Sequence, residues 1–414
     1  MKRMSALFQI GCAVGFFTTG AAAQTADKLH IDVVRLSDRV LIARPTGPQP
    51  TNTIAVATER GIVVVDPGIS PALAEAKRRR IAEEFGRNDF LYAVDTHDHG
   101  DHTYGNQAFA DLTIVGHRDV PSGMEANDQA RERTRTQINA ALPRLRERLA
   151  GMEAGSEAAE SLGETIAFYE AVASGLGEGF RLTPPTETFA DRESLDLGDD
   201  TLELVYFGKA HSDTDILVFF TREGLLATGD LFYPDNDLYI DSERVPFLSR
   251  WADNLDWILD PDTGVRTVVP GHEDPLPLEE VARIRDFVRE QAPLFEGKSS
   301  AFFDFRDTFR KDGVEAGLRR MSELKEQPDR FYFLHPEFDS FVYRLMLDDH
   351  LDDAIPLFEK LAKLFPEKPN AFDSLGEAYF RADRKDEAKA AFQRCLELDP
   401  ENRNARARLA ELGG

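Results

Sequence analysis

Cysteine is almost absent from this sequence of 414 residues, which contains only Cys12 and Cys395. If the N-terminal segment that carries Cys12 is removed, the rest of the chain cannot form an internal disulfide in any compartment. The length exceeds that of a usual single domain, so we expect one large unit and at least one smaller module.

Basic residues are also under-represented, with 49 Lys and Arg against 74 Asp and Glu and a net charge of −25. Loss of Lys2 and Arg3 with an N-terminal segment would bring the net charge to about −27. Nucleic acids and anionic membrane surfaces bind through clustered basic side chains, so the acidic balance excludes them as expected partners.

Long apolar runs are missing except near the N-terminus, where the stretch 6–17 is mostly apolar. This run is shorter than the roughly 20 residues of a membrane-spanning helix. Lys2 and Arg3 precede it, and Ala21-Ala22-Ala23 follows it as a small-residue cleavage site. Residues 1–23 therefore read as a signal peptide, which predicts an exported protein, periplasmic or secreted, without a stable membrane anchor.

Short β-branched runs separated by turn residues predict strands at 40–43, 53–57, 62–65, 90–94, 202–206, 216–220, 225–227 and 266–269. Pro71 suits the first turn of a predicted helix over 71–85. Alternating strands and helices are typical of an α/β fold, in which sites gather at the carboxyl ends of strands.

The segment from about 118 to 179 is instead helical in its apolar spacing, and 151–156 reads as the turn of a helical hairpin. Pro143 is expected to kink the first helix. Two roles stay open for this insert: packing against the outside of the core, or acting as a lid or dimer arm beside a site.

The C-terminal region has an internal period of about 34 residues, with units starting at His335 and Pro369 and a final helix over 402–412. This pattern resembles tetratricopeptide repeats, so 335–414 is expected to form a small all-α domain after a helical connector at 301–334. Two repeats are marginal alone, and we expect them to dock on the catalytic domain or on a protein partner. Cys395 would be a packed helix residue.

Five of the nine histidines fall at or just after predicted strand ends, and the densest group is the HxHxDH sequence of His97, His99, Asp101 and His102. Imidazole and carboxylate donors that converge in this way are typical of zinc and related metal sites. A purely structural role would bury adjacent polar rings at a high cost in free energy.

The segment 96–102 resembles the signature loop of metallo-β-lactamase-fold hydrolases, and the segments around His211, Asp230 and His272 are similar to the later motifs of that family. The resemblance covers about residues 30–275 within a catalytic domain placed at 24–300. It implies a four-layer αββα sandwich. It also implies that one metal is held by His97, His99 and His211 and a second by Asp101, His102 and His272, with Asp230 bridging them.

The same resemblance implies metal-assisted hydrolysis of an ester, thioester, lactone or related bond in a small-molecule substrate. Two Zn²⁺ are expected, with iron or manganese as alternatives, a hydroxide shared by the metals as nucleophile, and Asp101 as the residue that orients it and moves its proton. Asp66 is placed either to orient a ligand histidine or to cap a turn. The residues predicted to line the pocket, or else to pack, are Tyr104, His117, Phe232 and Tyr233.

Other functions remain open at this point. A periplasmic metallo-β-lactamase is the nearest alternative, although the aspartate at 230 stands where one lactamase subclass has cysteine. A tetratricopeptide scaffold with an idle metal domain is opposed by the complete set of seven ligands. An iron redox enzyme is opposed by the HxHxDH form, and a nucleic-acid-processing enzyme by the acidic charge.

Overall fold

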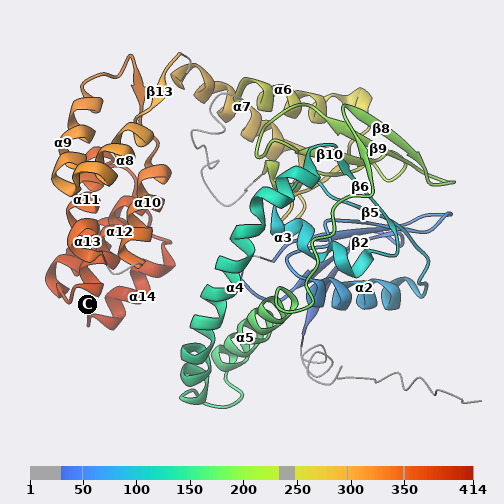
Figure 1. The fold of residues 1–414 in the computed structure, drawn as a ribbon, viewed down its shortest axis with the longest axis horizontal. Coiled ribbons are helices and arrows are strands. Elements are labelled where there is room, and N and C mark those ends of the chain that lie inside the picture. Colours follow the sequence, from blue (N-terminus) through green and yellow to red (C-terminus); the bar gives the residue numbers. More distant parts are fainter. Residues whose placement is uncertain (1–28, 49, 233–247, 296, 348–349, 414) are drawn as a thin grey trace, which may run out of the picture. The chain divides into compact units, whose positions relative to one another are not determined.

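The computed structural model describes residues 29–48, 50–232, 248–295, 297–347 and 350–413 (Figure 1). The predicted signal peptide and Tyr233 lie outside these residues. The chain forms two compact units: the first takes in residues up to 206 together with 214–230 and 269–274, and the second takes in 207–213, 231–268 and 275–414. The two units are described separately below.

A seven-stranded sheet begins the first unit, and its strands lie in chain order. Strands β1 to β4 pair antiparallel, and β4 to β7 pair parallel. The strands are β1 (Ile31–Arg35), β2 (Val40–Pro45), β3 (Thr53–Ala57), β4 (Ile62–Val65), β5 (Phe90–Val94), β6 (Thr113–His117) and β7 (Glu187–Phe189).

A second sheet of five strands has the order β12-β11-β10-β9-β8. Apolar side chains from both sheets, such as Ile42 and Val218, form one buried core, so the sheets pack face to face. The strands are β8 (Arg192–Asp196), β9 (Thr201–Tyr206), β10 (Ile216–Phe220), β11 (Leu225–Ala227) and β12 (Thr267–Val269).

Helix α2 (Pro71–Phe85) covers the other face of the seven-stranded sheet, where Ala74 and Ile81 join a second apolar core. Its ends follow from the sequence. The Ser70 side chain accepts a hydrogen bond from the Leu73 N–H, and Gly86 ends the helix with a φ of 63°. The helix therefore spans the residues that the sequence predicts.

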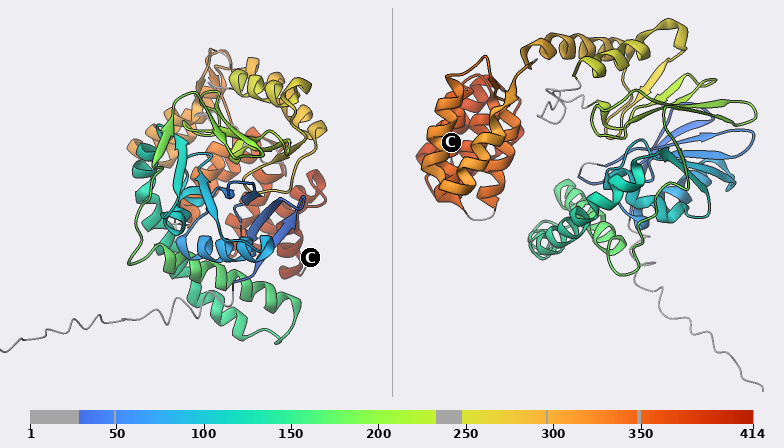
Figure 2. Two further views of the ribbon diagram at one scale, coloured as in Figure 1. Left: turned by 90° about the vertical axis from the view of Figure 1, so that its right-hand side faces the viewer. Right: turned by 45° about the horizontal axis from the view of Figure 1, so that its top comes forward.

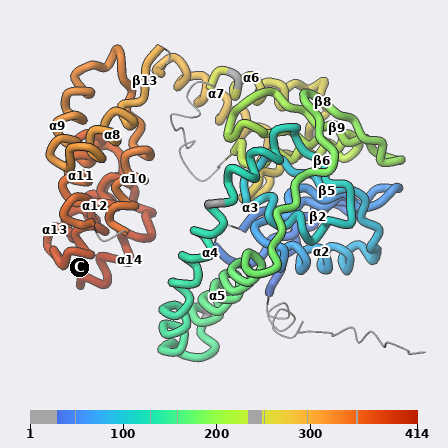
Figure 3. Tube along the Cα trace, viewed as in Figure 1, coloured from blue at the N-terminus to red at the C-terminus, as the bar shows by residue number. Residues whose placement is uncertain are grey.

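The helical insert consists of α4 (Val120–Ala150) and α5 (Glu157–Gly175), which lie side by side as a hairpin (Figures 1 and 3). Ile138 and Leu142 of α4 pack with Ile166 and Phe168 of α5. Pro143 lies inside α4, which continues as one helix through it. The helix runs on for seven residues beyond Pro143, and the kink expected there stays a prediction.

Four strands of the first unit, β1, β6, β7 and β8, are not among those that the sequence predicts, and two of them illustrate why. Strand β7 has the sequence ETF and β8 has RESLD, and most of their side chains are exposed. Each is the last strand of its sheet, so it lacks the apolar alternation of a strand packed on both sides.

The second unit is mainly helical, and the right view of Figure 2 shows its orange and red helices. Its core is apolar and rich in phenylalanine, including Phe305, Phe338, Phe358 and Phe392. No helix in the described parts of the chain is both long and apolar enough to cross a bilayer. The helices are α6 (Leu248–Leu259), α7 (Leu278–Phe295), α8 (Ala301–Asp312), α9 (Val314–Lys325), α10 (His335–Leu347), α11 (Leu351–Leu364), α12 (Pro369–Arg381), α13 (Lys385–Leu398) and α14 (Arg403–Glu411).

The segment 301–334, which the sequence treats as a connector, contributes to the core of the repeat array. Phe305 of α8 and Met321 and Leu324 of α9 are buried with the side chains of α10 to α13. Helices α8 and α9 therefore act as a third helical pair beside the two predicted repeats. This pair covers apolar surface of the array, and docking of the array on the catalytic domain or on a protein partner stays a prediction.

Candidate metal centre

The loop that follows β5 carries the HxHxDH residues and is fixed at both sheets. The N–H of Asp95 donates to the carbonyl of Val115 in β6 at 2.9 Å, and the N–H of Ile216 in β10 donates to the carbonyl of Thr96 at 2.8 Å. His97, directly after this point, is fully buried. The loop thus leaves the sheets at their carboxyl ends, where the sequence places the site.

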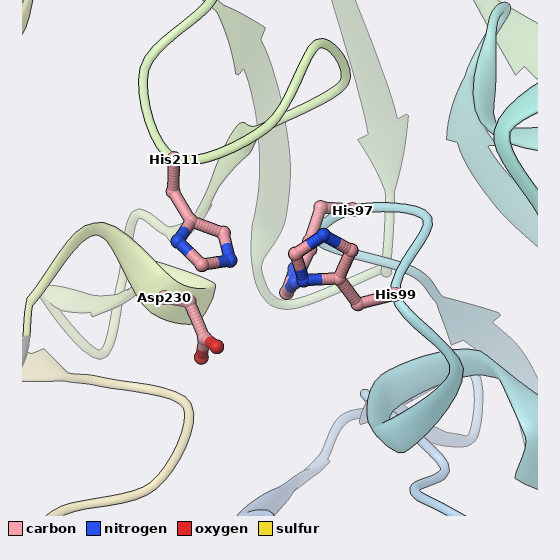
Figure 4. A group of neighbouring side chains, drawn as sticks. All are labelled: His97, His99, His211 and Asp230. Carbon is pink, nitrogen blue, oxygen red and sulfur yellow. The ribbon is translucent and has the colours of Figure 1, made fainter. Parts of the chain in front are cut away.

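Four side chains form the first group able to hold a metal: His97, His99, His211 and Asp230 (Figure 4). One nitrogen or oxygen from each lies within 4.8 Å of the others. The rings of His97 and His99 are 4.6 Å apart between centroids and are steeply inclined, as expected of two imidazoles directed toward one point. His97, His99 and His211 are those that the sequence assigns to the first metal.

A second group consists of Asp101, His102, Asp230 and His272. The short helix α3 (Gly100–Thr103) turns Asp101 and His102 toward it. Nε2 of His102 is 3.2 Å from Oδ1 of Asp230, and Nε2 of His272 is 3.2 Å from Oδ2 of Asp101. His102 Nε2 is buried and makes no hydrogen bond within the described chain, so a cation fits its surroundings.

Asp230 belongs to both groups and follows β11 in the turn η2 (Gly229–Leu231). Two glycines permit this position. A Cβ on Gly271 would overlap the Asp230 carboxylate, and one on Gly229 would lie 2.5 Å from Oγ1 of Thr96. The N–H of Gly271 donates to the carbonyl of Gly229 at 2.8 Å. The segments 228–230 and 270–272 are therefore joined through Gly229 and Gly271. This contact places Asp230 between the two ligand groups.

The charges of the second group favour a cation. Burial alone would lower the pKa of the two histidines, but the nearby carboxylates, Asp230 among them, raise the pKa of His102 well above its usual range and that of His272 to about 9. Burial would raise the pKa of Asp101, yet His102 and His272 hold it at about 2. The carboxylates that favour protonated histidines also favour a metal cation. A metal ion can replace these histidine protons, since imidazole binds metal in its neutral form.

Asp66 orients His102, the first of the two roles that the sequence leaves open. Its Oδ2 is 2.9 Å from Nδ1 of His102, and its carboxylate also accepts from the N–H and the hydroxyl of Thr96. With Nδ1–H donating to Asp66, Nε2 of His102 is directed at the second group. The backbone of Asp66 has a φ of 56°, in the left-handed region that few non-glycine residues adopt.

Two further residues hold the site and are not found by sequence reasoning. Lys77 of α2 is buried beneath Asp66, and its ammonium group donates to Oγ1 of Thr53. Burial lowers the pKa of Lys77 to about 7, although Asp66 raises it in part. Asp98 accepts hydrogen bonds from Thr214 and from Asn127 of α4. Asp98 was visible inside HxHxDH, but nothing in the sequence showed that it ties the loop to the insert.

The loop between β2 and β3 braces the second group from another side. The hydroxyl of Thr51 donates to the carbonyl of Asp101 at 2.9 Å. Nδ1 of His272 is 3.3 Å from the carbonyl of Pro50, which fixes the direction of its ring. The N–H of Asn52 donates to Gly271 at 2.7 Å. Two ligands of the group are thus held through one loop.

Three of the residues predicted to line the substrate pocket are buried. His117 is buried, stacks on Tyr206 and has Nε2 at 3.0 Å from the carbonyl of Ala190. Tyr104 packs against Gly100 beneath the metal loop, and Phe232 is buried. Their contact with a substrate stays a prediction.

Known proteins resemble separate parts of this chain. The profile of the tetratricopeptide repeat matches residues 369–402, the second predicted repeat. No curated protein matches the chain. Among solved structures, the chain resembles a metallo-beta-lactamase from Pontibacter korlensis at 17% identity and a TM-score of 0.43, covering 63% of this chain and 100% of that one. It also resembles a metallo beta lactamase from Erythrobacter litoralis at 16% identity and a TM-score of 0.41, covering 63% and 96%.

The profile of the metallo-beta-lactamase superfamily matches residues 46–272, more than half of the chain. All seven predicted ligands lie within that range. The chain therefore belongs to the metallo-beta-lactamase superfamily.

Proposed function

We propose that this protein is an exported two-metal hydrolase that acts on an ester, thioester, lactone or related bond. The observation that carries the proposal is the presence of Asp230 in two adjoining groups of nitrogen and oxygen donors. A shared carboxylate is typical of centres that hold two cations close together. Such donors suit zinc, and iron and manganese accept the same set.

His97, His99 and His211 would hold the first cation, and Asp101, His102 and His272 the second, with Asp230 contacting both. When bound, the cations supply the acidity that yields hydroxide from water near neutral pH and polarise the bond to be cleaved. Asp66 keeps the Nδ1 proton of His102 in place, so that Nε2 stays available as a ligand atom.

Asp101 is the residue best placed to act on the attacking water. Its side chain is 36% exposed, whereas that of Asp230 is 3% exposed, so Asp101 is the more accessible carboxylate of the second group. Its pKa of about 2 keeps it ionised at neutral pH, ready to accept a hydrogen bond from water. We assign it the task of orienting the water and passing on its proton.

Elemental analysis of the purified chain, combined with a hydrolysis panel, tests this proposal. The panel holds a lactone, a thioester, an aryl ester, a phosphodiester and a chromogenic cephalosporin. We expect about two metal equivalents per chain and turnover of a carbonyl substrate. Turnover of the cephalosporin alone would identify a β-lactamase instead. A chain that binds no added zinc would contradict the proposal and favour the scaffold function.

Two variants assign the activity to the site. His99→Ala and Asp101→Ala should each abolish turnover without unfolding the chain, because each removes a ligand from the open side of the site. His350→Ala and Asp119→Ala are the matched controls, since both of these side chains are exposed and outside the metal groups. Unchanged turnover in Asp101→Ala would refute the role given to Asp101.

Export and partner binding complete the proposal. Cleavage after Ala23 is supported by the charged, apolar and small-residue segments of the N-terminus. Intact-mass measurement of the protein from the periplasmic or extracellular fraction tests it, and a mass that retains residues 1–23 would contradict it. The tetratricopeptide repeats would bind a protein partner, as repeat arrays commonly do.

A further inference from the structure

A cavity of about 410 Å³ lies beside the second metal group, between the helical hairpin and the loop after β2. Helix α4 contributes Thr134, Gln137, Ile138 and Ala141, which are spaced so that they share one helix face. We call this cavity the hairpin pocket. Its other lining residues are Pro48, Ile69, Asp101, Phe168 and Tyr169.

The chemistry of the hairpin pocket is mostly apolar. Among the described residues that line it, Asp101 alone is charged, and Asp101 is also a predicted ligand of the second metal. Two larger cavities, of about 790 and 580 Å³, have several charged residues in their linings and contain none of the seven ligands. The hairpin pocket therefore combines the volume of a small-molecule site with direct access to the metal centre.

The walls of the pocket are fixed to the ligands. Pro48 lies in the wall, and three residues later the hydroxyl of Thr51 holds the carbonyl of Asp101. A Cβ on Gly47 would lie 2.5 Å from the ring of Phe168, so this loop packs closely on α5. On the other side, Asn127 anchors α4 to Asp98 of the metal loop. The pocket is therefore built into the site, which gives the hairpin a role beyond covering the core.

We infer that the hairpin pocket receives an uncharged, mostly apolar arm of the substrate, with the bond to be cleaved beside Asp101. This inference rests on the proposed hydrolase function and adds the class of substrate: one with an alkyl or aryl arm. Thr134 and Gln137 supply polar contacts at the pocket, and Ile69, Ile138 and Phe168 its apolar wall.

Binding of the neutral dye Nile red to the full chain, with and without zinc, tests the pocket apart from catalysis. Ala141→Trp fills the cavity with a large ring, and the matched control Ala140→Trp puts the same ring on the exposed neighbouring position. We expect the dye to bind the wild type and Ala140→Trp equally, to be displaced by 1-octanol, and to bind Ala141→Trp at least tenfold more weakly. Equal binding by all three proteins would overturn the inference.

A second variant guards against misfolding of Ala141→Trp. Gln137→Glu keeps the shape of an exposed side chain and adds a charge to the lining, so it should weaken dye binding while zinc content and helical circular dichroism stay unchanged. Undiminished dye binding in Gln137→Glu, together with a folded Ala141→Trp that binds normally, would exclude the pocket as the binding site.

Ester hydrolysis then links the pocket to turnover. Two series of ester substrates are lengthened, one on the acyl side and one on the alcohol side. In one of the series, kcat/KM of the wild type should rise by up to about fourfold per buried methylene, and Ala141→Trp should lose this dependence. Hydrolysis without any dependence on chain length would overturn the inference but keep the hydrolase. If Ala141→Trp removes dye binding and no substrate is hydrolysed, the binding pocket is supported and the hydrolase function is contradicted.

Discussion

The first unit buries charged groups at one end of its sheets, whereas the core of the repeat array in the second is mainly apolar, with large aromatic rings. In the first unit the buried polar side chains include Asp66, His97, His102 and Asp230. In the array the largest buried side chains are phenylalanines such as Phe338 and Phe392. Rings in a core stabilise the fold directly, whereas buried charges cost free energy unless something compensates them. The contrast shows where this protein holds groups for chemistry.

The largest expected effect comes from Asp230→Ala, because Asp230 serves both ligand groups. We expect bound zinc to fall to well below two equivalents and turnover to fall by roughly 10³-fold or more, beyond the loss typical of an outer hydrogen-bonding partner. Elemental analysis and kcat measure both effects. Retention of two zinc equivalents would contradict this role, because the buried Asp230 carboxylate would then not be needed to bind metal.

In the array, Phe392→Ala should lower stability and leave the metal site intact. The ring of Phe392 packs directly on Gly376, and its loss should cost about 3–5 kcal/mol in the free energy of unfolding. Denaturant unfolding measures this cost, and Phe303→Ala, at a ring that is 39% exposed, is the control. Loss of zinc from folded Phe392→Ala would show that the two regions are not separable in function.

Asp66→Asn tests whether a buried charged residue that is not itself a ligand also contributes to metal binding. The asparagine keeps the size of the side chain but loses the charge that fixes the Nδ1 proton of His102. We expect zinc affinity of the second group to fall by roughly 10- to 100-fold. Competition with a colorimetric chelator measures it against Asp119→Asn, whose side chain is exposed. An unchanged affinity would show that Asp66 only caps a turn.

The smallest effect concerns Asp339, one of several ionisable side chains that the array also buries. Burial raises its pKa to about 7, although Ser374 and Asn370 lower it in part. Folded Asp339 therefore keeps its proton between about pH 4 and 7, where the unfolded chain has lost it. It contributes stability that is lost as the pH rises through this window, by at most about 1.4 kcal/mol per pH unit.

Asp339→Asn should remove that slope and stabilise the array above pH 7. His335, whose Nε2 is 3.8 Å from Asp339, has a pKa lowered to about 4 by burial and contributes the opposite slope from pH 4 to 6.5. The informative quantity is therefore the difference in unfolding free energy between the variant and the wild type across pH 4 to 8. A difference that does not change with pH would contradict the buried carboxyl.

Much of the site could be predicted because its ligands are neighbours in sequence or follow strands directly. Helix α2 and strands β3, β4, β5, β10 and β11 match their predicted bounds, since local capping and β-branched runs decide them. His97 and His99 converge for the same reason, being two residues apart in one loop.

The parts that could not be predicted depend on contacts between distant residues. Ala141 and Pro48 meet in the hairpin pocket, although 93 positions separate their numbers in the chain. Lys77 reads as one basic residue among several in α2 until the fold buries it beneath Asp66. Periodicity identifies a helix and its apolar face, but not the partner against which that face closes.

The left-handed backbone at Asp66 is tolerated because its side chain serves the fold as well as the ligand. This conformation costs a non-glycine residue on the order of 1–3 kcal/mol, and glycine would relieve it. Glycine would also remove the carboxylate that orients His102 and that accepts from the buried N–H and hydroxyl of Thr96. A library selected only for thermal resistance should therefore keep Asp66, as should a library selected for turnover.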